Sequence, residues 1–139
     1  MIIAVCVDDN GGTMFNHRRQ SKDRVLCEEL LKLVANNILR MSPYSAKQFP
    51  AETQSRLAVD DRFLDLAQPG DYCFVEGVAL SPYEESIEEM ILFKWNRAYP
   101  KDTSLDIDID GPEWELIDSF DFEGTSHEKI TRERYKRKG

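Results

Sequence analysis

Three aspartates at alternate positions form the pattern in this sequence that most resembles a metal site. Asp106, Asp108 and Asp110, followed directly by a glycine, match positions 1, 3, 5 and 6 of a calcium-binding EF-hand loop. Position 12 of such a loop requires a glutamate that binds the ion through both oxygens, but the chain has Ile117 there. The flanking residues alternate as in strands, whereas an EF-hand needs helices. The pattern therefore predicts an acidic hairpin loop and no metal site.

Histidines and cysteines, which often carry catalysis or hold zinc, are few and scattered. His17 and His127 lie far apart in the sequence, and there is no Cys-x-x-Cys pair. The chain has an odd number of cysteines without regular spacing, which indicates reduced thiols that pack as small hydrophobic side chains. They are Cys6, Cys27 and Cys73. P-loop, Rossmann and Gly-x-Ser-x-Gly patterns are absent. We therefore assign no catalytic residue.

Adjacent arginines make the segment 16–20 the most unusual loop of the chain. Arg18 and Arg19 stand between a histidine and a glutamine. Two guanidinium groups can bind a phosphate or a carboxylate through paired hydrogen bonds. They can equally be solvated charges that pair with an acidic surface. The sequence leaves both alternatives open.

Negative charge is concentrated in one part of the chain. The net charge is −8, but residues 128–139 hold six basic and two acidic side chains, so the rest of the chain carries −12. Nine acidic residues and no basic residue lie between 102 and 123. Such a surface repels nucleic acid, so we expect no direct nucleic-acid binding; it attracts a basic protein surface, or it serves only as a solvated edge. The expected partner-binding face comprises Asp102, Asp106, Asp108, Asp110 and Glu113.

Length and composition indicate one globular domain over residues 1–139. Hydrophobic residues make up 41% and charged residues 32%, which is ordinary for a globular chain. There is no run of about 18 apolar residues, so we expect no membrane contact. The first residues, MIIAVCVDDN, lack the basic start of a signal peptide, and we expect a cytoplasmic protein.

Apolar patterns and turn signals predict alternating strands and helices. Alternation predicts a strand over 91–96, and leucines at helical spacing predict a helix over 21–35, capped by Ser21 and with Asp23 in its first turn. A Ser-Pro-Tyr-Glu capping box predicts a helix over 81–90. Further strands are expected at 2–7, 38–41, 56–60, 72–75 and 114–117, and helical turns at 44–49 and 62–67.

Two segments remain without a regular pattern. Residues 13–20 are expected to form a surface loop. The tail 128–138 fits either a strand or a capped helix by periodicity alone.

The order of segments in the second half resembles the dihydrofolate reductases. A strand ending in Glu76-Gly77, a short helix, the strand 91–96, an Asp-Thr turn and a Trp-Glu strand follow one another as in that family. The start, IIAVCVDDNGGTMFN, is similar to the family's first strand and the loop over the nicotinamide. The resemblance implies an α/β fold with a mainly parallel mixed sheet, a C-terminal antiparallel hairpin and helices on both faces. It also favours a closing edge strand for the tail.

The same resemblance implies a cleft whose chemistry has changed. Asp23 lies where the family has its folate-binding carboxylate, but the preceding Pro-Trp pattern is absent. The phosphate-cradling Gly-Arg-x-Thr is missing before Tyr44 and Ser45, and the family's Gly-Gly is Glu76-Gly77. A like-charge contact between Glu76 and a phosphate at ~4 Å costs about 4 kcal/mol. We therefore expect no dinucleotide cofactor. The cleft candidates are Asp9, Asn16, Arg18, Arg19, Asp23, Tyr44, Ser45, Glu76 and Gly77.

These observations lead to two hypotheses of different classes. The first is a non-catalytic acidic interaction protein, an inhibitor or adaptor of a basic partner such as a nucleic-acid-binding protein, on a degenerate dihydrofolate-reductase-like scaffold. The alternative is a small-molecule-binding protein or a divergent NADPH-dependent reductase that uses the old cleft, with Asp23, Arg18 and Arg19 as polar anchors. In either case we expect a monomer or homodimer and no dihydrofolate reductase activity.

Overall fold

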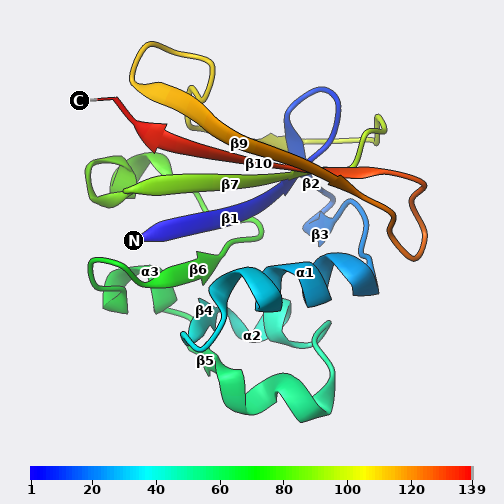
Figure 1. The fold of residues 1–139 in the computed structure, drawn as a ribbon, viewed down its shortest axis with the longest axis vertical. Coiled ribbons are helices and arrows are strands. Elements are labelled where there is room, and N and C mark those ends of the chain that lie inside the picture. Colours follow the sequence, from blue (N-terminus) through cyan, green and yellow to red (C-terminus); the bar gives the residue numbers. More distant parts are fainter. Residues whose placement is uncertain (139) are drawn as a thin grey trace.

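A seven-stranded mixed sheet organises the protein. The computed structural model describes residues 1–138, and the order of strands in its large sheet is β5-β4-β6-β1-β7-β10-β9. Every pairing from β5 to β7 is parallel, and β10 is antiparallel to both of its neighbours (Figure 1). The strands of this sheet are β1 (Ile2–Val7), β4 (Leu39–Met41), β5 (Leu57–Val59), β6 (Tyr72–Phe74), β7 (Glu89–Lys94), β9 (Trp114–Phe122) and β10 (Ile130–Arg137). The expected mainly parallel sheet with a C-terminal antiparallel hairpin is confirmed.

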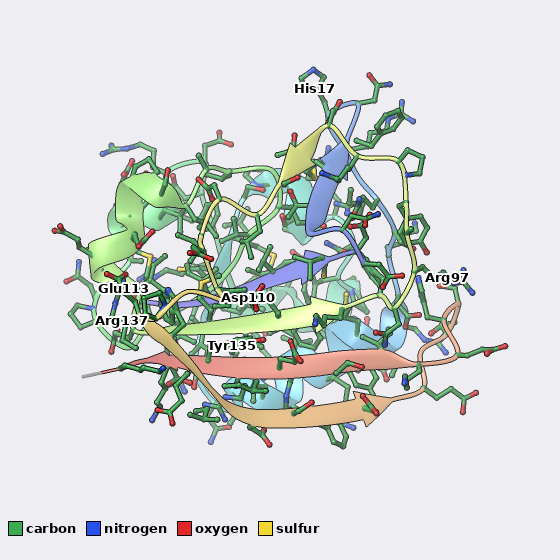
Figure 2. All side chains as sticks on the ribbon, turned by 90° about the horizontal axis from the view of Figure 1, so that it is seen from above. His17, Arg97, Asp110, Glu113, Tyr135 and Arg137 are labelled. Atoms are coloured by element: carbon green, nitrogen blue, oxygen red, sulfur yellow. The ribbon has the colours of Figure 1, made fainter. Side chains whose placement is uncertain are left out.

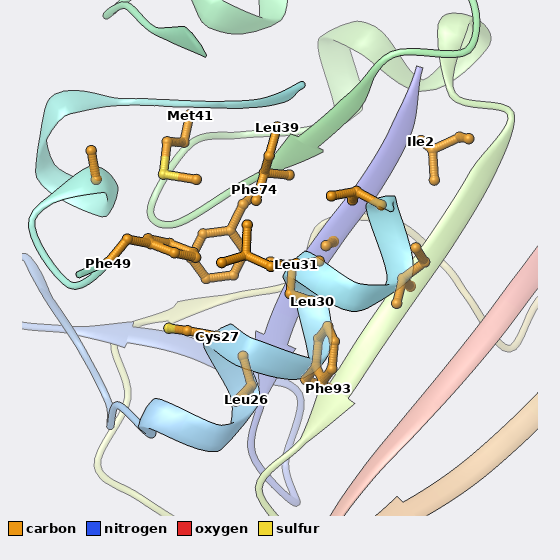
Figure 3. Packing of buried hydrophobic residues seen from close by; sticks show 14 of the residues in the cluster. Ile2, Leu26, Cys27, Leu30, Leu31, Leu39, Met41, Phe49, Phe74 and Phe93 are labelled. Atoms are coloured by element: carbon orange, nitrogen blue, oxygen red, sulfur yellow. The ribbon is translucent and has the colours of Figure 1, made fainter. Parts of the chain in front are cut away.

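Helices cover both faces of this sheet. On one face, buried leucines of the first helix belong to one apolar cluster with Ile2 and Phe93, and Phe49 meets Phe74 edge to face with ring centroids 5.9 Å apart (Figure 3). On the other face, Phe63 and Leu80 belong to a second apolar cluster. The α-helices are α1 (Arg24–Val34), α2 (Pro43–Ala46) and α3 (Phe63–Leu66), and the 3₁₀ helices are η1 (Ala51–Arg56) and η2 (Ser81–Ser86). No helix among residues 1–138 has the length and apolar character needed to cross a bilayer.

The segment 13–20, expected as a loop, instead belongs to a small second sheet. β2 (Gly12–Phe15) pairs on one side with β3 (Arg18–Arg19) and on the other with β8 (Thr103–Ser104). Asn16 and His17 connect β2 to β3, and both have positive φ, 52° and 62°. Two such residues are typical of the tight hairpin turn whose twist matches its strands. Without a glycine in the turn, the sequence carries little signal for it.

The predicted helix over 81–90 is wrong in its second half. A 3₁₀ helix ends at Ser86, Ile87 is extended, and β7 begins at Glu89. Ser81 makes no side-chain cap, because Leu80 holds the cap position. Met90 pairs with Ile3 in the sheet, so strand pairing outweighs the helical spacing of the apolar residues.

The tail forms a strand, as the family resemblance favours, but that strand is not at the edge. β10 lies between β7 and β9, so the two strands of 91–118 do not pair with each other. The edge strand next to β10 is β9, which extends to Phe122 rather than ending at Ile117. Its exposed apolar side chains are Leu116, Ile117 and Phe120.

Candidate functional site

An ion pair lies beyond the carboxyl end of β6. Glu76 follows β6, and Arg19 reaches it from β3 in the small sheet. Arg19 Nε donates to Glu76 Oε2 at 2.9 Å, and its Nη2 donates to Oε1 at 3.2 Å. The side chains are only 20% and 7% exposed, so this is a largely dry, two-point pair rather than a solvated contact.

Side chains of the α2 region complete the network around this pair. The Arg19 guanidinium lies 4.2 Å from the centre of the Tyr44 ring, and the Arg19 N–H donates to the Tyr44 hydroxyl at 2.9 Å. Gln48 Nε2 donates to Glu76 Oε1 at 3.0 Å. Arg19 thus balances the charge of Glu76. The expectation that an unpaired Glu76 repels a ligand phosphate is therefore wrong, because Glu76 is paired with Arg19.

Two further contacts lie at the strand end beside the pair, next to a cavity of about 250 Å³. Gly77 has φ +73°, and a Cβ placed there would lie 3.0 Å from Met14 Cε, so Met14 packs directly on this glycine. Asp106 accepts hydrogen bonds from the N–H groups of Leu80 and Ser81 at 2.9 to 3.0 Å. Burial raises the pKa of Asp106, but these N–H donors outweigh burial and hold it below its ordinary value. The carboxylate of Asp106 thus occupies the place at the start of η2 where an external anion would bind.

Asp23 caps α1 and ties it to a distant loop. Its Oδ1 accepts from two N–H groups in the first turn of the helix, at 3.0 and 3.4 Å, so Asp23, not Ser21, is the N-cap. The N–H groups of Thr125 and Ser126 donate to the same carboxylate, each at 2.9 Å. Burial raises the pKa of Asp23, but the Ser126 and Thr125 donors and His127 hold it well below its usual range. The charge of Asp23 therefore stabilises the fold.

His127 joins this carboxylate to three hydroxyl groups, of which Ser126 Oγ lies 3.1 Å from Nδ1. Its Nδ1 lies 3.1 Å from Asp23 Oδ2, and its Nε2 lies 2.8 Å from the Tyr99 hydroxyl and 3.3 Å from Ser21 Oγ. The Trp95 ring stacks on the imidazole at 4.5 Å. The side chains of His127 and Asp23 are 2% and 0% exposed. No sequence pattern indicated this cluster, because His127 is 104 residues from Asp23.

A cavity of about 490 Å³ lies between α1, the residues after α2 and the loop 124–126. One part of its wall is basic, with Lys22, Arg24 and Lys47. Another part is formed by Cys27, Phe49 and Pro50. Burial raises the pKa of the Cys27 thiol to about 12, so this wall is uncharged at neutral pH.

The remaining cleft candidates lie outside these networks. Asp9, Asn16 and Arg18 are exposed. Ser45 is buried, and its N–H donates to Ser42 Oγ at 3.2 Å within the cap of α2. Of the nine candidates, Arg19, Tyr44 and Glu76 are brought together, while Asp23 contacts His127.

Asp8, rather than Asp9, is the buried carboxylate after β1. It accepts hydrogen bonds from the N–H groups of Gly12 at 2.7 Å and Tyr99 at 3.0 Å, and from Gln20 Nε2 at 3.1 Å. Burial raises the pKa of Asp8, but the N–H donors of Tyr99 and Gly12 outweigh burial and lower it. Asp8-Asp9-Asn10-Gly11-Gly12 predicts a turn, but not which aspartate closes it.

The expected acidic face is partly engaged in the fold. Asp102 accepts a hydrogen bond from the Asn16 N–H at 2.9 Å. Glu113 Oε2 lies 3.7 Å from Arg137 Nη1, and Figure 2 shows these two side chains next to each other. Asp106, Asp108 and Asp110 are all exposed, and the Asp106 carboxylate accepts a hydrogen bond at the start of η2. Within residues 1–138 no ion pair includes any of the four aspartates. Most of this charge is therefore not neutralised by lysine or arginine.

Comparison with known proteins identifies the scaffold. The sequence matches no protein-family model and no curated protein. In structure the chain is similar to a dihydrofolate reductase from Enterococcus faecalis, solved with NADP(H) and RAB-propyl. The match covers 100% of this chain and 97% of that chain, with a TM-score of 0.67 and 12% sequence identity. The expected dihydrofolate-reductase-like fold is confirmed, and at this identity the likeness concerns the fold alone.

Proposed function

We propose that this chain is a binding protein for a small anion with an apolar or aromatic part, and that it does not use a dinucleotide cofactor. The observation that carries the proposal is the cavity of about 490 Å³ beside α1. It has the size of a small-molecule site and combines apolar walls with a few charged groups.

Charge favours an anionic ligand at this position. Lys22, Arg24 and Lys47 gather around one cavity in a protein whose net charge is −8. Phe49 and Cys27 offer an apolar surface for the rest of the ligand. An aromatic carboxylate of the folate or aminobenzoate type fits both features.

The case against a dinucleotide rests on side chains that occupy its space. In a dinucleotide site the backbone at the strand end and the following helix start must approach the phosphates. Here Arg19 pairs with Glu76 after β6, Met14 packs on Gly77, and Asp106 already accepts from the N–H groups at η2. A phosphate would have to displace a carboxylate that this protein supplies itself.

Thermal-shift measurement and calorimetry with named ligands test the proposal. The probes are 4-aminobenzoyl-glutamate, folic acid, benzoate, inorganic phosphate and NADPH. An aromatic carboxylate at 100 times its dissociation constant should stabilise the protein by about 2.7 kcal/mol, and NADPH should not. Lys22→Ala and Lys47→Ala should weaken binding, whereas Lys32→Ala near the far end of α1 should not. Stabilisation by NADPH alone, or equal binding by all three variants, would contradict the proposal.

The acidic interaction protein is the second candidate, and β9 favours it. This edge strand exposes Leu116 and Phe120 next to Asp118 and Asp121. Exposed apolar groups rimmed by polar side chains are typical of protein-interaction sites. A basic partner would compete there with Arg132, whose Nη2 lies 2.8 Å from Asp118 Oδ2.

Charge reversal separates this candidate from a merely solvated edge. Asp108→Lys combined with Asp110→Lys should abolish capture of a basic partner in a pull-down, and the exposed Asp61→Lys serves as control. Asp106 is left unchanged because it holds the start of η2. Unchanged capture by the double variant would remove this candidate.

A further inference from the structure

We propose that Ser21, His127 and Asp23 form a nucleophile, base and positioning residue, and that the chain transfers an acyl group from an activated ester to water. This activity goes beyond the binding function proposed above. Only its substrate preference rests on that function.

The geometry is that of a serine nucleophile next to an oriented base. Ser21 Oγ lies 3.3 Å from His127 Nε2, and His127 Nδ1 lies 3.1 Å from Asp23 Oδ2. An ionised carboxylate can only accept, so the proton of a neutral imidazole is on Nδ1. Nε2 is then left as the acceptor that faces the hydroxyl of Ser21.

The two groups that orient the base are rigidly held. Asp23 is fixed by the first turn of α1 and by the Thr125 and Ser126 N–H groups. Trp95 stacks on the imidazole at 4.5 Å and fixes the plane of its ring. A base held in one orientation loses little entropy when the reaction takes place.

Ser21 is placed where a substrate can reach it. It is half-buried, whereas the side chains of His127 and Asp23 are almost fully excluded from solvent. The two residues that follow it, Lys22 and Asp23, form part of the wall of the 490 Å³ cavity beside α1. An ester with a carboxylate on its acyl part can therefore place that carboxylate at Lys22 and its carbonyl next to Ser21.

Tyr99 competes for the same lone pair. Its hydroxyl lies 2.8 Å from His127 Nε2, closer than Ser21 Oγ. Nε2 has a single lone pair, so a full hydrogen bond from Tyr99 weakens the one from Ser21. Removal of the Tyr99 hydroxyl should therefore increase the reactivity of Ser21.

The reaction balances with water as the only co-reactant. Ser21 Oγ forms a bond to the carbonyl carbon, its proton moves to His127 Nε2, and the ester C–O bond breaks as the leaving alcohol takes that proton. Water then attacks the acyl-serine, His127 carries its proton to Ser21 Oγ, and the carboxylic acid leaves. The net change is hydrolysis of the ester.

A fluorophosphonate probe tests the nucleophile directly. Ser21 Oγ would form an O–P bond as the P–F bond breaks and fluoride leaves with the serine proton, which adds the mass of one probe less that of HF to the intact protein. Peptide mapping should place this mass on Ser21. Ser21→Ala should abolish it, and Ser119→Ala on exposed β9 should not. Tyr99→Phe should label faster than the wild type, a result that a purely structural hydrogen-bond network would not give.

Ester hydrolysis tests the substrate class and the role of Asp23. After subtraction of each ester's spontaneous rate, mono-p-nitrophenyl succinate should be hydrolysed faster than p-nitrophenyl acetate. Lys22→Ala should lower the rate for the succinate ester more than the rate for the acetate ester. Asp23→Asn, compared at temperatures where circular dichroism shows it folded, should lower kcat on the order of 10²-fold with little change in KM.

The outcomes separate the two proposals. Labelling of Ser21 without a preference for the succinate ester supports the nucleophile and contradicts the anionic ligand. The nucleophile is overturned if Ser21 stays unlabelled while trypsin is labelled in the same solution, or if Tyr99→Phe reacts no faster.

Discussion

The guanidinium of Arg19 and the carboxylate of Glu76 meet through two hydrogen bonds, although 57 residues separate them in the chain. This contact joins the small sheet to the end of β6 in the large sheet. The region where strand ends, a hairpin and α2 meet is therefore closed by the chain's own side chains.

Removal of Arg19 should destabilise the protein more than removal of its neighbour. Arg19→Ala leaves a carboxylate that is only 7% exposed without its cation, and we expect the free energy of unfolding to fall by about 2–3 kcal/mol. The exposed Arg18→Ala should change it by less than about 0.5 kcal/mol. Urea unfolding of both variants measures the difference. Equal effects would mean that the pair contributes nothing specific.

Substitution of Gly77 should reveal the contact with Met14. Gly70 and Gly77 both have positive φ, +84° and +73°, so alanine should cost about 1 kcal/mol at either site from the backbone alone. A Cβ at Gly70 meets nothing within 4 Å, whereas one at Gly77 lies 3.0 Å from Met14 Cε. We expect Gly77→Ala to lower the melting temperature more than Gly70→Ala. The same melting temperature for both would show that Met14 yields without cost.

Stability should fall in acid through carboxylates whose pKa values are lowered in the folded state. The folded pKa of Asp23 is below the ordinary Asp value of about 3.9, as are those of Asp8 and Asp106. The unfolded chain therefore binds protons first as the pH falls, so this stability is complete above about pH 5 and lost progressively below it.

Asp23→Asn isolates the largest of these contributions. Melting temperatures of this variant should depend less on pH between about 5 and 2 than those of the wild type. The exposed Asp61→Asn should follow the wild type. A wild-type melting temperature that stays constant down to pH 2 would contradict the assignment.

The cysteines should resist alkylation while the protein is folded. Burial raises the pKa of Cys27 to about 12 and that of Cys73 to about 11, and it also raises the pKa of Cys6. At pH 8 the ionised fraction of the Cys73 thiol is then about one in a thousand. Mass spectrometry after iodoacetamide should show no adduct on the native protein and three on the unfolded chain. Ser119→Cys, on exposed β9, should react readily as a positive control.

Short apolar runs predicted the parallel strands well because their signal is local. Strands at 2–7, 38–41, 56–60 and 72–75 all correspond to observed strands, within a residue or two at their ends. Residues 87–90 show the limit of this signal. Their helical spacing favoured a helix, but pairing with β1 draws them into an extended conformation.

The candidate site was predicted only in part, because its contacts join distant segments. Arginines at 18 and 19 indicated a polar site, but only the second faces Glu76. Adjacent strand residues point to opposite sides of a sheet. A loop prediction for this segment does not include that alternation, so it does not distinguish Arg18 from Arg19. His127 carries no signal in the sequence, because Tyr99 and Asp23 lie 28 and 104 residues away from it.

Because β10 lies between β7 and β9, β9 has no partner strand in this sheet until β10 has been synthesised. As the chain leaves the ribosome, β9 emerges before the strand that must separate it from β7. Until β10 follows, the nascent β9 exposes two unpaired rows of amide groups together with Leu116, Ile117 and Phe120. Its run of carboxylates then acts as a safeguard, because like charges keep neighbouring nascent chains from joining strand to strand.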